Sequence, residues 1–235
     1  MTVLQATCID FKYPSKQLFN RASLRVESGA IVGLLGPNGS GKTTFFDIIC
    51  GLKHLDGGSL TNPFTNPLYL SQTVMTPPAL RMFDIFKMTT LICSPSPMDK
   101  HHVLAKLAAW SPPVLERYKE IWGKKSSLCS YGEKRWFFTV SLLSIEADLY
   151  ILDEPTARVD PEFRFYIWQC LRGAAKDGAA ILVSSHNVEE ICENCDGFYM
   201  ISQQKFKHFE HGESFKNHYQ ATTLDQAFIR AAAGS

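Results

Sequence analysis

One glycine-rich segment carries the residue types and the spacing of a phosphate-binding loop. It reads Gly36-Pro37-Asn38-Gly39-Ser40-Gly41-Lys42-Thr43. This segment matches the pattern G-x-x-x-x-G-K-[ST] at every fixed position. Glycines let backbone N–H groups wrap phosphates, Lys42 can reach the β- and γ-phosphates, and the Thr43 hydroxyl can bind Mg²⁺. Apolar residues 30–35 predict the strand that must precede the loop, and residues 44–50 predict the helix that must follow it.

Two carboxylates end a short apolar segment later in the chain. Asp153 and Glu154 follow residues 149–152, which predict a buried strand. Buried acids are rare without a partner. Beside a phosphate loop, Asp153 can hold Mg²⁺ through water, and Glu154 can polarise the water that attacks a phosphoryl group. The alternative is that the pair is structural.

Gln72 and His186 each follow a predicted strand, at residues 67–71 and 179–184 respectively. Ligand chemistry in α/β sheets gathers at such strand ends. Gln72 can bind Mg²⁺ or a water molecule, and His186 can hold a γ-phosphate. Taken singly, a surface glutamine and a structural histidine explain these two residues as well, so both alternatives stay open.

Tyr13 lies 29 residues before Lys42, at the end of a predicted strand. Its flat ring could stack on an adenine base, although position alone also allows an ordinary strand-end tyrosine.

The segment Ser130-Tyr131-Gly132-Glu133 opens a predicted helix and supports two compatible interpretations. Ser130 with Glu133 forms the pattern of a capping box. A serine-capped helix start with a glycine two residues later, here Gly132, is also a good anion site.

Bulk composition narrows the class of protein. The 235 residues are 45% hydrophobic, which is enough for a large core. The 24 basic and 23 acidic residues nearly cancel, so the chain as a whole has no positive electrostatic field that would attract nucleic acid. The apolar runs are much shorter than the ~20 residues that span a bilayer. We therefore expect a cytosolic chain that could dock on a membrane protein. The seven cysteines, among them Cys192 and Cys195, are expected to be reduced, buried thiols.

Hydrophobic periodicity and turn residues predict a single α/β domain over residues 1–235, with residues 1–77 and 147–235 forming the core and a β subdomain. Residues 78–146, punctuated by proline pairs and by Ser94-Pro95-Ser96-Pro97, form an inserted helical subdomain. The other expected elements are strands 2–11 and 18–26, a turn-rich connection over 51–67, a helix over 161–175 capped by Asp160, a hairpin over 198–209 and a C-terminal helix over 223–233.

The order of these motifs resembles the ATP-binding cassette (ABC) ATPases over nearly the whole chain. The resemblance implies a P-loop NTPase core with an antiparallel β subdomain, and ATP and Mg²⁺ as cofactors. It implies that Thr44 and the loop bind ATP, that Tyr13 stacks on adenine, and that Glu154 is the catalytic glutamate. It also implies that Thr43, Gln72 and Asp153 bind Mg²⁺ and that Ser130 and Gly132 contact phosphate. Asp160 matches the aspartate of the loop after the catalytic glutamate, and His186 matches the switch histidine.

Two segments depart from the usual family pattern. The signature motif reads Cys129-Ser130-Tyr131-Gly132-Glu133, where Leu-Ser-Gly-Gly-Gln is usual, and Arg158 is bulky for a dimer interface. Residues 159–161, 184–190 and 223–230 are similar to the ATPases of drug-resistance exporters.

The resemblance implies partners of two kinds and no nucleic acid. The first is another ABC ATPase subunit, in a homodimer or a heterodimer, and the second is an integral membrane permease on whose cytoplasmic face the chain would lie. The alternative is a soluble ABC ATPase of iron–sulfur cofactor assembly, because Glu133-Lys134 resembles the signature of those proteins.

Overall fold

A six-stranded sheet forms the centre of the molecule, in a computed structural model that describes residues 2–93 and 100–234. In sheet order the strands are β5 (Pro67–Leu70), β6 (Leu149–Asp153), β7 (Ala180–Ser184), β3 (Ile31–Leu35), β8 (Gly197–Ser202) and β9 (Lys205–Phe209). The first five run parallel, and β9 pairs antiparallel with β8 as the predicted hairpin at the sheet edge. Because β3, β6 and β7 are buried along their whole length, their sequences are continuous apolar runs.

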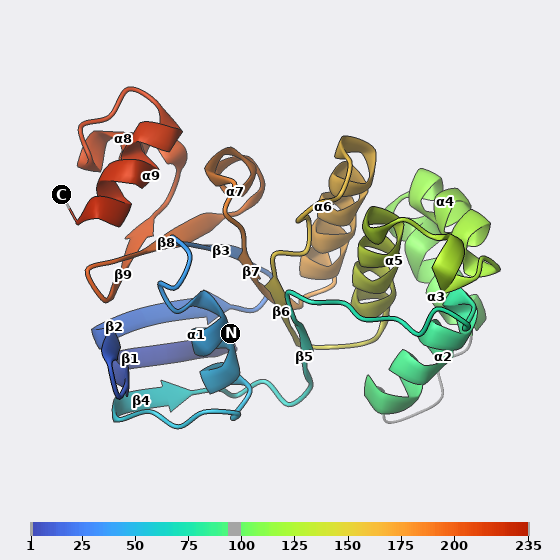
Figure 1. Cartoon of the computed structure of the whole chain (residues 1–235), viewed down its shortest axis with the longest axis horizontal. Coiled ribbons are helices and arrows are strands. Elements are labelled where there is room, and N and C mark those ends of the chain that lie inside the picture. Colours follow the sequence, from blue (N-terminus) through green and yellow to red (C-terminus); the bar gives the residue numbers. More distant parts are fainter. Residues whose placement is uncertain (1, 94–99, 235) are drawn as a thin grey trace.

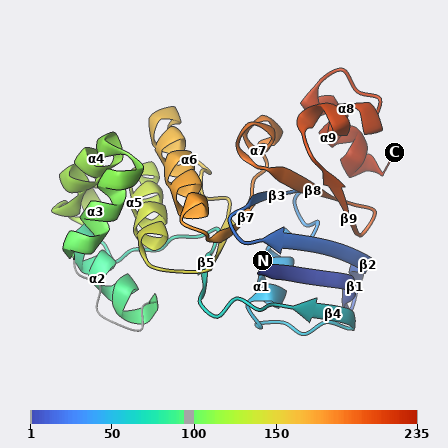
Figure 2. The same cartoon turned by 180° about the vertical axis from the view of Figure 1, so that it is seen from behind.

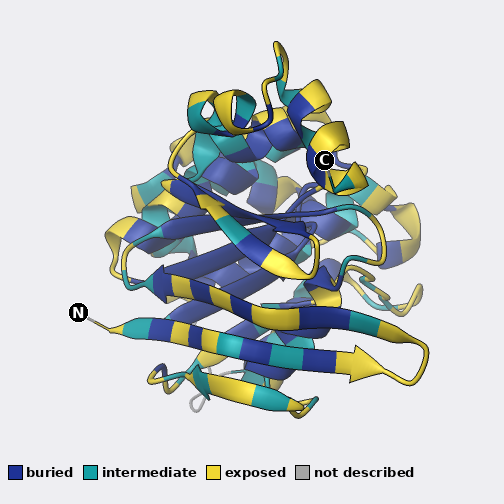
Figure 3. Cartoon of the chain, turned by 90° about the vertical axis from the view of Figure 1, so that its left-hand side faces the viewer, coloured by how far each residue is buried: buried dark blue, intermediate teal, exposed yellow. Residues whose placement is uncertain are grey.

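A second, antiparallel sheet packs beside the first and consists of β2 (Lys16–Glu27), β1 (Val3–Tyr13) and β4 (Gly57–Thr61). Figure 3 shows buried and exposed residues alternating along β2, as expected for a strand with one covered face. The prediction of a turn-rich connection over 51–67 is wrong in part, since it contains β4. This edge strand has no apolar pattern that would predict it. Its Gly58 has φ +79°, and a Cβ there would lie 2.3 Å from the Cys8 carbonyl oxygen, so this position requires glycine.

Helix α1 (Lys42–Ile49) joins the two sheets through a shared apolar core (Figure 1). Its Phe45 packs against Phe19 of β2 and Phe206 of β9, with ring centroids 6.0 and 4.7 Å apart. On the opposite face of the central sheet lies a second core, to which α5 (Tyr131–Ser144), α6 (Pro161–Lys176), α7 (Val188–Asn194) and α9 (Leu224–Ala233) contribute. The two faces of the central sheet are therefore both covered, and α1 packs in the core that the two sheets share.

The predicted helical segment contains α2 (Met82–Cys93), α3 (Lys100–Trp110), α4 (Pro112–Trp122), the short 3₁₀ helix η1 (Ser126–Leu128) and α5. Figures 1 and 2 both place these helices at the end of the molecule opposite β1, β2 and β4. The ring of Tyr118 in α4 stacks on Phe137 in α5 at 4.5 Å, so α5 connects the helices to the core. The boundaries at residues 78 and 146 stay a prediction, and Ser94-Pro95-Ser96-Pro97 lies outside the described residues.

The C-terminal part contains one unpredicted helix, α8 (Gly212–His218), followed by the expected α9. The seven cysteines are free thiols, but the prediction that they are buried is wrong for five of them. Only Cys129 and Cys170 are buried, and Cys192 and Cys195 are half-buried. Among the helices of the described residues, none combines the length and the apolar character needed to cross a bilayer.

Candidate functional site

Four neighbouring strands deliver the predicted chemical groups to one edge of the central sheet. The phosphate loop follows β3, Gln72 follows β5, Asp153 and Glu154 end β6, and His186 follows β7. Since these strands are parallel, their carboxyl ends lie together. A cavity of about 590 Å³ lies there. It is lined by Tyr13, Lys16, Leu18, Asn38, Gly39, Gly41, Lys42, Thr43, Thr44, Gln72, Asp153 and Glu154.

The phosphate loop is tightly wound and holds Lys42 inside it. A Cβ on Gly36 would lie 2.5 Å from the Ser40 hydroxyl, so a larger residue at this position would displace the Ser40 side chain. The Lys42 ammonium donates to the Gly36 carbonyl at 2.7 Å, and burial lowers its pKa although Glu154 and Asp153 oppose that shift. The buried Ser40 hydroxyl has no hydrogen-bond partner within the described residues. A buried cation beside an unpartnered hydroxyl and glycine backbone fits a bound phosphate chain.

Asp153 is almost completely buried and held by two hydroxyl groups. One carboxylate oxygen accepts from Thr43 Oγ1 and the other from Ser184 Oγ, each at 2.6 Å. Gln72, from the adjacent strand, lines the same cavity. Hydroxyl, carboxylate and amide oxygens are the hard donors that Mg²⁺ prefers, so this set fits the ion.

Glu154 brings together the two residues that sequence reasoning could only consider singly. Gln72 Nε2 donates to Glu154 Oε2 at 3.3 Å, and His186 Nδ1 lies 3.4 Å from the same oxygen. The Glu154 side chain is nearly buried, whereas that of His186 is 66% exposed. An exposed histidine in contact with a buried carboxylate can respond to a ligand that enters from solvent.

Tyr13 lies at the cavity wall, and the residue is 40% exposed. Its hydroxyl is 3.4 Å from Thr44 Oγ1, and its ring meets Phe11 edge-on with centroids 5.2 Å apart. Lys53 Nζ lies 5.6 Å from the ring centroid. The ring is therefore fixed at the cavity by its neighbours while part of it faces solvent.

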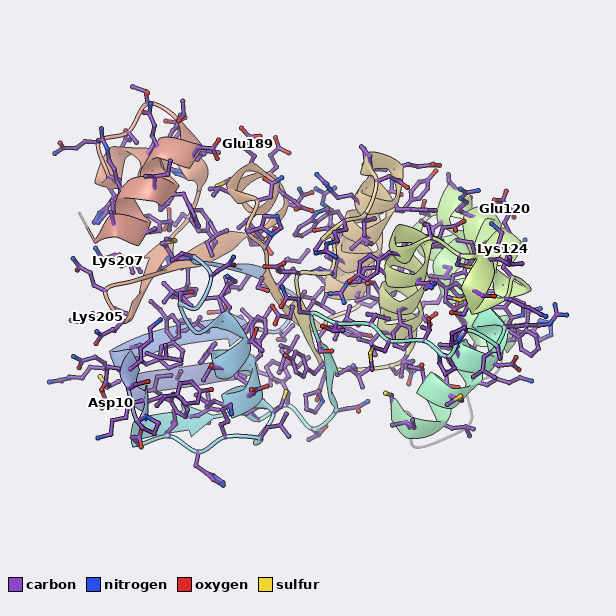
Figure 4. All side chains as sticks on the ribbon, in the orientation of Figure 1. Asp10, Glu120, Lys124, Glu189, Lys205 and Lys207 are labelled. Carbon is purple, nitrogen blue, oxygen red and sulfur yellow. The ribbon has the colours of Figure 1, made fainter. Side chains whose placement is uncertain are left out.

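The signature segment does not reach this cavity. Ser130 Oγ accepts from the Glu133 amide at 3.0 Å, and Glu133 accepts from the Ser130 amide at 2.8 Å, so the predicted capping box is confirmed. Glu133 also accepts from Lys124 at 3.1 Å, on the helical side of the molecule in Figure 4. Gly132 packs against the Arg158 carbonyl, where an added Cβ would be 3.3 Å away.

The loop after Glu154 meets the signature segment within the same chain. The Arg158 guanidinium lies 5.8 Å from the centroid of the Tyr131 ring. Asp160 caps α6 as predicted, accepting from the Phe163 amide at 3.0 Å. Like Ser130 and Gly132, Asp160 is absent from the cavity lining.

Three residues near the site were missed by sequence reasoning. Lys16 lines the cavity and donates to the Gly39 carbonyl at 2.7 Å, Ser184 holds Asp153, and Arg135 is buried behind the strand ends. The only sequence signal for Arg135 is a charge among the apolar residues of a predicted helix.

Comparisons with known proteins agree with this geometry. The profile of the ABC transporter family matches residues 19–157. Protein McbF of Escherichia coli is 29% identical over 235 residues, covering 97% of this chain and 94% of that protein. The Nod factor export ATP-binding protein I of Burkholderia orbicola (strain AU 1054) is 30% identical over 207 residues, which are 83% of this chain and 66% of that protein.

Solved structures match the fold along almost its whole length. An ATP-binding subunit of an ABC transporter superimposes with a TM-score of 0.80 at 20% identity, covering 98% of this chain and 99% of that one. A nucleotide-free ATP-binding cassette gives a TM-score of 0.76 at 17% identity, with coverage of 97% and 99%. Because the family profile spans more than half of the sequence, the chain belongs to the ABC transporter family, as one of its ATP-binding ATPase subunits.

Proposed function

We propose that this ATPase hydrolyses ATP at the cavity beside the phosphate loop and thereby powers a separate membrane permease in an exporter. The main support for ATP hydrolysis at this cavity is that Gln72 and His186 both contact the same oxygen of Glu154, next to the Thr43–Asp153 pair. This arrangement supplies a buried carboxylate for a water molecule beside a set of oxygen ligands for a metal ion.

ATP binding is assigned to residues that line or build the cavity. Lys42 and the backbone of the phosphate loop hold the phosphates, Thr44 follows them at the helix start, and Tyr13 stacks on the adenine. Thr43, Asp153 and Gln72 hold Mg²⁺, which when bound neutralises charge on the phosphate oxygens. Placing these groups before the reaction begins lowers the entropic cost of reaching the transition state.

Glu154 is assigned the role of orienting and polarising the attacking water. Its carboxylate is buried among strand ends, where a charge interacts more strongly than it does in water. His186 reaches from the exposed side and can donate to a γ-phosphate oxygen.

Ser130 and Gly132 are assigned to the ATP of a second ABC ATPase subunit, in a homodimer or a heterodimer. Both lie outside the cavity of their own chain, yet Ser130 stands at the positive end of α5. Asp160 belongs to the loop that would face the partner. ATP binding would close the dimer and hydrolysis would reopen it, shifting the permease between two states.

Export is supported by the relative whose name includes Nod factor export. We place the chain on the cytoplasmic face of a membrane, bound to its permease. The alternative in iron–sulfur assembly depended on Glu133, for which the capping box gives a sufficient structural reason. We therefore favour the transporter.

Glu154→Gln tests the hydrolytic role. The amide keeps the side-chain shape but removes the charge that polarises water, so hydrolysis should fall about 100-fold or more while ATP still binds. Phosphate release gives the rate, and size-exclusion chromatography with ATP should show a nucleotide-dependent dimer. Glu162→Gln, at an exposed position in α6, is the matched control and should hydrolyse normally. Normal hydrolysis by Glu154→Gln would exclude Glu154 from this role.

Co-purification tests the membrane partner. The tagged chain, extracted in mild detergent from the cells that produce it naturally, should bring down an integral membrane protein with several spanning helices. The ATPase rate of that complex should exceed the rate of the chain alone. Recovery of soluble partners only would contradict the transporter proposal and favour the assembly alternative.

A further inference from the structure

Arg135 is a fully buried charged residue in α5 that takes no part in the cavity lining. It lies five residues after Ser130, so it belongs to the helix that begins at the signature segment. A buried guanidinium destabilises the fold unless its donors are satisfied. Its Nε has no hydrogen-bond partner among the described residues, so the bonds made by Nη1 and Nη2 indicate what it holds in place.

The Arg135 guanidinium binds backbone carbonyl oxygens from the ends of two strands. Nη1 donates to Ser71 at 2.7 Å and to Gln72 at 3.1 Å, just beyond β5. Nη2 donates to Asp153 at 2.5 Å and to Glu154 at 2.9 Å, at the end of β6. One side chain thus joins helix α5 to the two segments that carry Gln72, Asp153 and Glu154.

The backbone at Glu154 needs such support. Its φ is +52°, in the left-handed region that a residue with a Cβ rarely adopts. The Glu154 amide is held by the Ser184 carbonyl at 3.2 Å and the Ser184 hydroxyl at 3.1 Å, and its carbonyl is held by Arg135. These contacts fix the direction in which the Glu154 carboxylate leaves the chain.

The geometry of the contact is specific to arginine. A guanidinium presents donors in a rigid, planar fork that can reach two strand ends at once. A lysine ammonium is a point charge on a flexible stem and cannot hold the same two pairs of oxygens in one orientation. Charge alone would not replace this contact.

We propose that Arg135 is a positioning residue for hydrolysis, which holds Glu154 and Gln72 in their working arrangement and ties that arrangement to the helix of the signature segment. This inference rests on the proposed role of Glu154. Arg135 makes no contact with the phosphate loop or Tyr13 among the hydrogen bonds of the described residues, so ATP binding should not depend on it.

Arg135→Lys and Arg135→Gln test the inference in the full chain. The kcat for ATP hydrolysis, expressed per folded molecule, should fall about tenfold to a hundredfold in both, because a displacement of about 1 Å has that effect on a positioned group. The Kd for ATP, titrated without magnesium to prevent turnover, should stay close to the wild-type value. Two variants are tested, and the kcat and Kd are compared with wild type for each variant that keeps the native circular dichroism spectrum.

Tyr118→Phe is the matched control for lost stability. Tyr118 is also fully buried, and its hydroxyl bonds to Ser141 Oγ at 2.7 Å, far along α5 from the strand ends. This variant should lower Tm without changing kcat per folded molecule. If Arg135→Lys likewise lowers only Tm, Arg135 is structural and the inference is wrong. Normal hydrolysis by Glu154→Gln would instead overturn the proposed function, so the two failures differ.

Discussion

At the scale of the residue, two sets of groups line the cavity, and we propose that one set binds ATP and the other acts on it. Tyr13, Lys42 and Thr44 line its wall around the phosphate loop, while Glu154 lies at a strand end with Gln72. A substitution in the first set should therefore change affinity, and one in the second should change turnover.

Tyr13→Ala should weaken ATP binding by about 1–3 kcal/mol, the usual contribution of a base stacked on an aromatic ring. Tyr13→Phe keeps the ring and loses only the hydroxyl near Thr44, so it should bind ATP nearly as well as wild type. Isothermal titration with ATP and with inorganic triphosphate separates base from phosphate binding. An unchanged ATP affinity for Tyr13→Ala would leave Tyr13 as a strand-end residue only.

Residue positions at strand ends could be predicted, but contacts to backbone could not. Gln72, Glu154 and His186 each follow an apolar segment, and parallel pairing then necessarily brings them to one edge. Arg135 and Lys16 bind carbonyl oxygens, whose positions depend on how distant elements pack. A sequence does not encode such partners in any local pattern.

At the scale of the element, the start of α5 has two possible roles, and these predict different effects of substituting Ser130. As a cap, the Ser130 hydroxyl satisfies the Glu133 amide and stabilises the fold. As a ligand for the partner's ATP, the same hydroxyl would act on turnover.

Ser130→Ala should lower stability by about 1 kcal/mol through the lost cap and should also strongly reduce hydrolysis. ATP binding to a single subunit should be nearly intact, because Lys42 and Thr43 belong to the chain's own site. Thr223→Ala is the control, since Thr223 caps α9 in the same way by accepting from Gln226 at 3.2 Å. If both variants lose the same stability and hydrolyse ATP normally, Ser130 acts only as a helix cap.

Elements with a strong periodic or capping signal could be predicted, and weak ones could not. The capping box of α5 and the Asp160 cap of α6 are both present in the sequence. By contrast, α8 begins with the unusual cap His211, whose Nδ1 accepts from Ser214, and β4 is a polar edge strand rich in glycine. Their formation depends on packing against the rest of the chain.

At the scale of the whole molecule, the two sets of predicted ATP ligands lie apart in one chain. The cavity holds the phosphate loop, whereas Ser130 and Gly132 lie outside its lining. Head-to-tail pairing of two subunits would bring one set to the other, giving two sites that each need both chains. Tyr131 and Arg158, in contact with one another, would then lie near that interface.

Complementation between two inactive variants tests this two-chain site most directly. In a mixed dimer of Ser130→Ala with Lys42→Ala, one site contains both lesions and the other is complete. Equal mixing should restore about a quarter of the wild-type ATPase rate, since half of the dimers are mixed and each has one of two sites. Wild type mixed equally with the doubly substituted chain is the control: its mixed dimers contain no complete site, so only the wild-type homodimers work and the rate should fall to about a quarter of wild type, whereas sites built from one chain would leave about half. Phosphate release from the first mixture well above the rate of either variant alone is the predicted result, and no increase at all would contradict the shared site.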